Sequence, residues 1–581
     1  MRLKSAIKPA AHKSDESHDY VPRLTSISFL NFKAFGEWQT LPIKPLNLIF
    51  GRNSSGKSSI FHALLWIRHL LLNENLNVYK PTLSGDFVDL GGLRRYVHFS
   101  KKNKHASRKY GFRFEVEIPQ EKFLDAVMSG SPLRRGMRSR FLDRMGKSAA
   151  QEIKDAWSEF LELFGPIAGK INLQLEVVFE NFKIPQPEKF RSFKCLPEVS
   201  LILGGEKILV FSPKQKAMSI ERSHFEENYS PYYSVTCHSK KLYVKGIPIL
   251  ANLIQSIVSQ RLKLHGHKKL KWVPSKQQVN SIFQDIDLSL GGRGFRPRIS
   301  GLRFIPKGRY TLGREDTYNK DAGDLTRSEL NKLMLSNLKG TFHDFVNECG
   351  TSLYVPVVAL FRSLNYLAAY RNYPEREISE ASMVNVRPGP YGEESFQDIL
   401  KDPKMISAIN RACEKLGADF KFGTYLSHHA GRHVTIKHED GYPLSFRDIG
   451  FGWSQVIPVI VELVQSSSTL TTLLVEQPEL HLHPSNQSEL MDVVLDHVTQ
   501  NAESTVFLEV HSEQMILRLL KRIKEKRNGS SAGSVRPNQC SILHVFKGKE
   551  GSVIRPYRVS DSGTMIDPWP GGFFESALKD L

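Results

Sequence analysis

The sequence LNLIFGRNSSGKSS, residues 46–59, decides the fold. Its apolar first part, Leu46–Phe50, predicts a short buried strand, and the following Ile60–Leu72 predicts a helix. Between them, Gly51–Ser58 fits the pattern G-x-x-x-x-G-K-[ST] at every fixed position. The order strand, glycine loop, helix is that of a phosphate-binding loop. In such a loop the backbone N–H groups and the positive end of the helix surround phosphate oxygens.

This loop predicts a site for ATP and Mg²⁺. We expect Lys57 to neutralise the β and γ phosphates and the Ser58 hydroxyl to bind Mg²⁺. The residues expected to contact the nucleotide are Asn53, Ser54, Ser55, Gly56, Lys57, Ser58 and Ser59. The alternative is a chance Gly-Lys-Ser turn, and the placement between an apolar strand and a helix argues against it.

A second predicted strand supplies the acidic group that a phosphate loop needs. Thr472–Glu476 is an apolar run that ends in a carboxylate, and QPELHLHP follows it. We therefore expect Glu476 to hold Mg²⁺ together with Ser58, directly or through water. An apolar run ending in Glu is weak evidence by itself, and it becomes strong evidence through its pairing with the phosphate loop.

Two further segments are candidates for contact with phosphate. In DIGFGWSQ, residues 448–455, glycines and a serine open a predicted helix, which makes Gly452, Ser454 and Gln455 candidate ligands. The alternative is a glycine loop with an ordinary N-cap serine. Thr505–Val510 predicts another apolar strand, and it ends at His511, where a side chain that senses the γ-phosphate would lie.

The composition bounds the class of protein. The 581 residues are 40% hydrophobic and carry a formal charge of +20, which excludes a disordered chain and favours an anionic partner. The first residues, 1–20, are polar and lack the apolar core of a signal peptide, and no apolar stretch is long enough to span a bilayer. The five cysteines form no CxxC pair. We expect a cytoplasmic protein without membrane contact.

The order of the predicted elements indicates one α/β core that a large insertion divides in sequence. The expected parts are a flexible arm at 1–20, an N-terminal lobe at 21–99, a basic α+β insertion at 100–353, a C-terminal lobe at 354–545, and a tail at 546–581 packed on the core. No apolar heptad persists for several turns, so long coiled-coil arms are not expected.

Basic side chains in the insertion are candidates for binding DNA or RNA. They are Arg134, Arg135, Arg138, Arg140, Arg144, Lys268, Lys269, Lys271, Arg293, Arg296 and Arg298. A solvated surface, or a docking face for an acidic protein, explains them equally well, because interleaved aromatic residues are few.

Two groups of histidines resemble metal ligands by residue type. His481 and His483 stand beside Glu479 but lack an evident fourth ligand, which favours a structural role. The second group falls on a predicted hairpin and is expected on its solvated face: His428, His429, His433 and His438.

Taken together, the motifs resemble the head of an ABC-type ATPase: phosphate loop, signature loop, acidic strand and histidine loop, in that order. More narrowly, EQPELHLHP (476–484) and DIGFGWSQVIPV (448–459) resemble the prokaryotic ABC/AAA-type ATPases of the overcoming-lysogenisation-defect and Septu-like anti-phage defence group. LAAYRNYPER (367–376) and the tail DPWPGGFFESAL are similar to segments of the same group. The resemblance covers 24–99 and 354–581, and it implies a mixed, largely parallel sheet.

The resemblance implies a dimer that holds ATP between the phosphate loop of one chain and the signature loop of the other. Ser454 would then contact the γ-phosphate of the partner's ATP, and His511 would sense that of its own. One position departs from the wider class: Gln477 stands where a second acid usually polarises the attacking water. An amide cannot accept the proton, so either Glu479 takes part or hydrolysis is slow.

The chain shows no nuclease motif of its own, which implies a separate effector. The preferred interpretation is an ATPase that self-associates around ATP and controls a nuclease or toxin in anti-phage defence. The alternatives are a RecF-like ATPase that binds DNA in genome maintenance, and a scaffold that binds ATP without useful turnover.

Overall fold

The computed structural model describes residues 22–72, 109–129, 169–179, 197–213, 326–380, 390–427, 431–465, 471–501, 503–527 and 535–569, with short pieces between them. The two basic clusters of the insertion, His428 and His429 lie outside the described side chains, so the proposed nucleic-acid surface stays a prediction. Among the described residues, no helix has the length and apolar character needed to cross a membrane.

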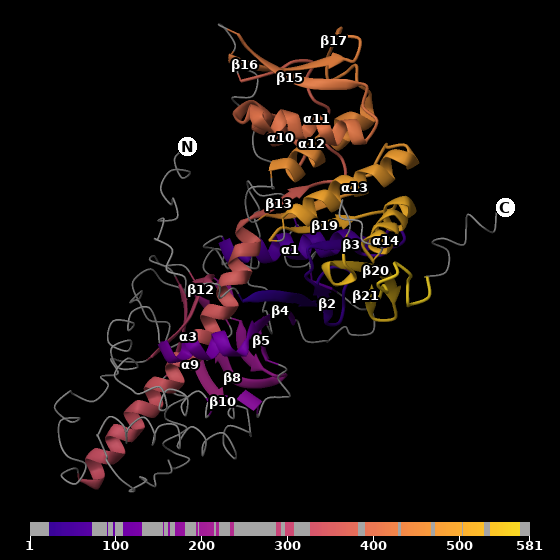
Figure 1. Ribbon diagram of the computed structural model, residues 1–581. Helices are drawn as coiled ribbons and strands as arrows, with labels where there is room; N and C mark the ends of the chain where they lie inside the picture. The colour runs from indigo at the N-terminus through magenta and orange to yellow at the C-terminus, as the bar shows by residue number, and fades with distance from the viewer. Residues whose placement is uncertain are drawn as a thin grey trace.

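A six-stranded sheet carries the phosphate loop at its centre (Figure 1). Its order is β13-β18-β19-β3-β20-β21, and every neighbouring pair is parallel except β20 and β21. The strands are β3 (Leu46–Phe50), β13 (Leu364–Leu367), β18 (Thr472–Glu476), β19 (Thr505–Glu509), β20 (Cys540–Gly548) and β21 (Gly551–Tyr557). β3 is buried along its length, as its unbroken apolar sequence predicts.

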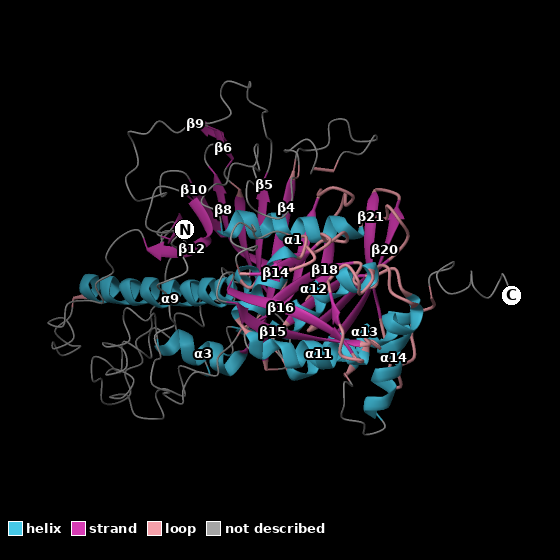
Figure 2. Ribbon diagram, turned by 90° about the horizontal axis from the view of Figure 1, so that it is seen from above, coloured by secondary structure: helices cyan, strands magenta, loops and turns pink. Residues whose placement is uncertain are grey.

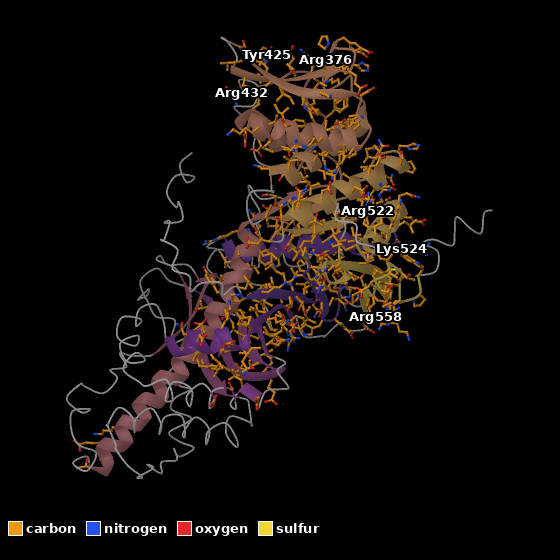
Figure 3. The ribbon with its side chains drawn as sticks, viewed as in Figure 1. Arg376, Tyr425, Arg432, Arg522, Lys524 and Arg558 are labelled. Atoms are coloured by element: carbon orange, nitrogen blue, oxygen red, sulfur yellow. The ribbon has the colours of Figure 1, made fainter. Side chains whose placement is uncertain are left out.

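Helices cover this sheet, and three of them form one buried core with it. The helices are α1 (Lys57–Leu72), α12 (Phe451–Gln465), α13 (Pro484–Gln500) and α14 (Glu513–Arg527). Apolar residues of α12, α13 and α14 pack with those of β3, β18 and β19 in a single buried cluster. Asp492 of α13 accepts hydrogen bonds from Arg518 and Arg522 of α14, and Figure 3 labels Arg522.

A second sheet of seven antiparallel strands lies beside the first, in the order β10-β8-β7-β5-β4-β1-β2. Its strands are β1 (Arg23–Leu30), β2 (Gln39–Pro42), β4 (Tyr110–Pro119), β5 (Lys170–Phe179), β7 (Glu198–Leu203), β8 (Glu206–Pro213) and β10 (Tyr233–Cys237). The alternation of apolar and polar residues predicts strands at Leu24–Phe32, Tyr110–Ile118 and Ile171–Phe179, and β1, β4 and β5 confirm them. A helix is predicted at Gln120–Met128, and α3 (Gln120–Ser129) confirms it. Two short pairs complete this part: β6 (Phe193–Cys195) with β9 (Ala217–Ser219), and β11 (Ile286–Gly291) with β12 (Pro297–Pro306).

A small third sheet lies above α10 (Glu393–Lys401) and α11 (Ile406–Lys415) at the top of Figure 1. It consists of β14 (Ile378–Ser379), β15 (Phe420–Ser427), β16 (Gly431–His438) and β17 (Pro443–Leu444). The antiparallel pairing of β16 with β17 confirms the hairpin predicted around Asp440-Gly441.

The longest described helix, α9 (Arg327–Arg362), is one that the sequence pattern misses. Its interior contains Gly340, Gly350 and Pro356, and its apolar residues keep no regular stripe, so periodicity gives little signal. Thr326 and Glu329 form a capping box at its start. α9 packs against β4 and β5 of the second sheet, and Figures 1 and 2 both show one end of it continuing beyond the sheets. The boundary proposed at 353/354 falls inside this helix.

The described topology confirms the predicted fold class. The sheet around β3 is mixed and largely parallel, and its strands come from both sides of the insertion, because β3 precedes it while β13, β18 and β19 follow it. This is the mixed, largely parallel sheet that the resemblance to an ABC-type ATPase head implies.

Candidate functional site

The phosphate loop joins the end of β3 to the start of α1, as predicted. Both glycines of the loop are required, because a Cβ at either position would clash with a neighbour and because both have a positive φ angle. A Cβ on Gly51 (φ 149°) would lie 2.2 Å from the Val545 carbonyl oxygen, and one on Gly56 (φ 106°) would lie 2.8 Å from the Ala34 Cβ. The loop is therefore enclosed by β20 and the β1–β2 connection, which leaves no room for larger residues.

The loop side chains differ in exposure. Asn53 and Ser54 are exposed, Gly56, Ser58 and Ser59 are partly buried, and Ser55 and Lys57 are buried. The Ser55 hydroxyl has no hydrogen-bond partner within the described part of the chain. An unpaired buried hydroxyl inside a glycine loop is a polar group that a phosphate oxygen would satisfy.

The Lys57 ammonium is folded back onto its own loop. Its Nζ donates to the carbonyl oxygens of Gly51 (3.1 Å) and Arg52 (3.2 Å) and lies 3.9 Å from Oε1 of Glu509. Burial lowers the pKa of Lys57, and the carboxylate of Glu509 counters part of that effect. A cation held against neutral carbonyls has lost hydration without gaining a close anion, which favours binding of an added phosphate.

Glu509, at the end of β19, is a site residue that the sequence reasoning missed. It is only 3% exposed, and its Oε2 accepts a hydrogen bond from the Ser58 hydroxyl at 2.9 Å. Burial, and then the nearby charge of Glu476, raise the pKa of Glu509 to about 7. The signal was present in the sequence, because a glutamate inside the apolar run TVFLEV is seldom buried without a partner.

Glu476 ends β18, as predicted, and lies beside Glu509 in the register of the parallel pair. Its Oε1 accepts a hydrogen bond from the Tyr366 hydroxyl of β13 at 3.1 Å. Burial raises the pKa of Glu476. Two carboxylates thus project from neighbouring strand ends close to the Ser58 hydroxyl, at the edge of the sheet where parallel folds bind ligands.

The turn after β18 holds Gln477 and Glu479 in different ways. Gln477 has a left-handed backbone (φ 45°), and its N–H donates to the Glu509 carbonyl oxygen at 2.8 Å, so the turn is anchored to β19. Glu479 is buried, and its Oε1 accepts the backbone N–H of His511. Burial raises the pKa of Glu479. Its participation in hydrolysis stays a prediction, and its described contact is with the histidine loop.

His511 follows β19 and is partly buried near the phosphate loop. Burial lowers its pKa, and the positive charge of Lys57 lowers it further, so both effects favour the neutral ring. A neutral ring beside Lys57 can donate one N–H toward a phosphate. The structure therefore brings His511, Lys57, Ser58 and Glu476 to one edge of the sheet, and the sensing role of His511 stays a prediction.

The predicted signature residues lie in the first turns of α12. Ser454 and Gln455 are buried there, so neither side chain is exposed for contact with a phosphate held by a partner. The Ser454 hydroxyl is buried and donates to the Phe451 carbonyl oxygen at 2.6 Å. Gly452 packs against the turn after β18, since a Cβ there would lie 2.7 Å from the His481 carbonyl oxygen. The predicted contact of Ser454 with ATP needs its hydroxyl to turn away from Phe451.

Arg371, another residue that the sequence reasoning passed over, joins α12 to β18. Its side chain is fully buried and donates from Nη1 to the Gln455 carbonyl oxygen (3.1 Å) and from Nη2 to the Glu476 carbonyl oxygen (2.7 Å). The Gln455 side chain in turn bonds the backbone N–H and carbonyl of Arg371. Burial lowers the pKa of Arg371 to about 10, against the opposing charges of Glu479 and Glu476.

Lys33, after β1, forms a third unpredicted contact. Its backbone is left-handed (φ 46°), and its Nζ donates to Nδ1 of His62 on α1 at 2.7 Å. Burial, and then the charge of Lys33, lower the pKa of His62 to about 4. Burial lowers the pKa of Lys33, while the charge of Glu476 raises it, so the two lie within electrostatic reach.

The described histidines of the two groups that resemble metal ligands have structural contacts instead. His481 is exposed and lies edge-on to Phe451, with ring centroids 4.8 Å apart, and His483 caps α13 by accepting from Ser485. His433 stacks on Tyr425 and His438 stacks on Tyr442.

Two AAA-domain family models match the chain. The model described as "AAA domain" matches residues 26–163, which include the phosphate loop, and the model described as "AAA domain, putative AbiEii toxin, Type IV TA system" matches residues 365–516. The second match includes the signature segment, Glu476 and His511. A search of the curated proteins finds no match.

Solved structures similar to the chain include heads of SMC proteins. The SMC head domain from Thermotoga maritima is 8% identical, with 92% of this chain and 100% of that chain covered and a TM-score of 0.31. The Smc head domain with an extended coiled coil, bound to the C-terminal domain of ScpA and derived from Pyrococcus furiosus, is 11% identical, with 93% and 97% covered and a TM-score of 0.34. These values are too low to carry an argument. The two AAA-domain matches and the phosphate loop on a parallel sheet support a P-loop ATPase of the ABC/AAA class.

Proposed function

We propose that this ATPase hydrolyses ATP slowly, self-associates around it, and controls a separate nuclease or toxin effector in anti-phage defence. One observation carries the nucleotide part of the proposal. Lys57 and Ser58 of the loop lie within reach of the carboxylates of two neighbouring strand ends and of His511, and Lys57 has no closer anion than Glu509 at 3.9 Å within the described residues.

The oxygen donors at this edge fit Mg²⁺. The ion prefers hard oxygen ligands and is usually held by one or two carboxylates together with substrate phosphates. Ser58 and Glu476 would hold it, and when bound it neutralises charge that develops on the transferred phosphoryl group. Lys57 would exchange its carbonyl partners for phosphate oxygens, and the neutral His511 would donate a hydrogen bond to the γ-phosphate.

Gln477 supports the slow rate. Its amide can orient water by hydrogen bonding but cannot take up the proton that water loses. The backbone bond to β19 and the left-handed conformation hold this residue at the end of the carboxylate pair. ATP would then act largely as a clamp between two copies of the chain, with the start of α12 of one copy facing the nucleotide of the other. Gly452 and Ser454 would make the contact once the Ser454 hydroxyl turns away from Phe451, while the Gln455 amide is already bonded to Arg371.

The effector and its role in defence rest on less direct support. The family description that matches 365–516 names a toxin of a type IV toxin–antitoxin system, and the motifs at 448–484 resemble those of defence ATPases. Gln477 equally favours the second candidate, a scaffold that binds ATP with negligible turnover. The charge of +20 favours the third, a RecF-like ATPase that binds DNA.

An affinity pull-down of the tagged chain from its own host separates these functions. Recovery of a stoichiometric nuclease or toxin that is lost with Lys57→Ala supports control of an effector. Recovery of DNA with repair proteins, and of no toxic partner, would instead move the assignment to genome maintenance. Light scattering of the purified chain with ATP, ADP and no nucleotide measures self-association, which we expect only with ATP.

A further inference from the structure

The carboxylate that contacts the phosphate-loop serine is Glu509 and not Glu476. β19 lies between β18 and β3 in the sheet, so its last residue is one strand closer to the loop than Glu476 is. The Ser58 hydroxyl accordingly donates to Glu509, while Glu476 accepts a hydrogen bond from the Tyr366 hydroxyl on the opposite side.

The two glutamates lie side by side on neighbouring strands. Glu476 and Glu509 are partners in the parallel register of β18 and β19, and register partners project from the same face of a sheet. Both carboxylates therefore point toward the same side, with Ser58 in contact with the nearer one. This places three oxygen-bearing side chains at one strand edge.

The negative charge of the buried Glu509 carboxylate is also poorly balanced by nearby positive charge. Its side chain is 4% exposed, and the closest cation among the residues that the structure describes, Lys57, is 3.9 Å away and already bonded to two loop carbonyls. A carboxylate with so little solvent exposure is stable as an anion only beside a cation. A divalent cation brought in with the nucleotide would supply the missing positive charge.

We infer that Glu509 is a third protein residue of the Mg²⁺ site, acting with Ser58 and Glu476 when nucleotide is bound. The inference rests on the proposed nucleotide site. Mg²⁺ would draw the Ser58 hydroxyl away from Glu509, and Glu509 would hold the ion directly or through a water molecule bound to it. The competing role is a clamp that only keeps Ser58 and Lys57 in place while nucleotide is absent.

The two roles differ in how they depend on the metal. The test uses the full chain and a fluorescent ATP analogue, with its Kd measured in Mg²⁺ and in EDTA for the wild type and for Glu509→Gln. Glutamine keeps the size and the acceptor oxygen for Ser58, so the fold is expected to persist. A matched control is Glu462→Gln, a buried glutamate of α12 whose bonds come from Asn365 and Ser395.

For Glu509→Gln we expect the gain in affinity from Mg²⁺ to fall about tenfold or more, with the Kd in EDTA unchanged or lower because a negative charge is removed. Glu462→Gln should behave as the wild type. Binding of Mn²⁺ in the presence of the analogue, followed by the free-ion electron paramagnetic resonance signal, should weaken in parallel.

An unchanged Mg²⁺ dependence and unchanged Mn²⁺ affinity in Glu509→Gln would overturn the inference and leave the proposed nucleotide site standing. No binding of the analogue by the wild type would overturn both. Should Glu509→Gln fail to fold, Glu509→Asp, which withdraws the carboxylate by one methylene, must show the same loss of Mg²⁺ dependence.

Discussion

Replacing Arg371 should loosen the connection between the signature helix α12 and the end of β18. Arg371→Met keeps much of the buried stem but removes two hydrogen bonds, one to the Gln455 carbonyl oxygen and one to that of Glu476. Hydrogen bonds from a charged donor contribute about 1.5–3 kcal/mol each. Removing the guanidinium also releases its desolvation cost of several kcal/mol, while it takes one of the nearby positive charges away from the buried carboxylates of Glu476 and Glu479.

The expected balance is a loss of about 2–4 kcal/mol in the local stability of this connection. Since about 1.4 kcal/mol corresponds to a factor of ten, backbone amides of α12 and β18 should exchange with deuterium about 30 to 1000 times faster. Arg371→Lys keeps the charge but lacks the planar fork, so it should recover only part of the protection.

Hydrogen–deuterium exchange of peptides that cover 451–465 and 472–476 measures this directly. The control is Arg376→Met. Arg376 lies in the same loop between β13 and β14 as Arg371 but is exposed, and Figure 3 labels it at the upper sheet. Exchange in Arg371→Met within threefold of the wild type would refute the reasoning. Equal acceleration by Arg376→Met would refute it too, because the effect would not depend on the buried guanidinium.

Three further predictions follow from other contacts. Gly452→Ala puts a Cβ 2.7 Å from the His481 carbonyl oxygen, at a cost of about 1–3 kcal/mol. Light scattering should therefore show weaker ATP-dependent self-association, while the affinity for nucleotide stays unchanged. Self-association equal to that of the wild type would contradict this prediction. The pKa of His62 is about 4 in the fold and 6.5 in the unfolded chain, so the unfolded state takes up the proton first as the pH falls. Urea unfolding should therefore show that the free energy of unfolding of the wild type falls by about 2 kcal/mol between pH 7 and pH 5, and that this fall is absent in His62→Asn. An equal fall in both proteins would contradict the prediction. Gln477→Glu restores a proton acceptor and should raise phosphate release about tenfold or more; an unchanged rate would mean that the amide does not limit hydrolysis.

The local order of strand, loop and helix could be predicted from the sequence because it depends on neighbouring residues. Leu46–Phe50, the glycine loop and Thr472–Glu476 each carry their own pattern of apolar residues, glycines and a terminal acid. The same holds for β1, β4 and β5, whose alternation is visible without knowledge of their partners.

The missed residues depend on which strands become neighbours. Glu509 matters because β19 lies between β18 and β3, and sequence order does not give that spatial order. Arg371 precedes α12 by many residues and meets it only through tertiary packing. The Ser454 hydroxyl differs from these two, because its bond to the Phe451 carbonyl oxygen is local to the first turn of α12.

The most direct test of the account is the affinity of the chain for ATP with Mg²⁺. Isothermal titration should give a defined Kd for the wild type and a value about 10 to 100 times weaker for Lys57→Ala, because charge-assisted bonds to phosphate are lost. Lys524→Ala, at an exposed lysine of α14 labelled in Figure 3, should bind as the wild type does. Equal affinity of the wild type and Lys57→Ala, or no binding by either, would contradict the account.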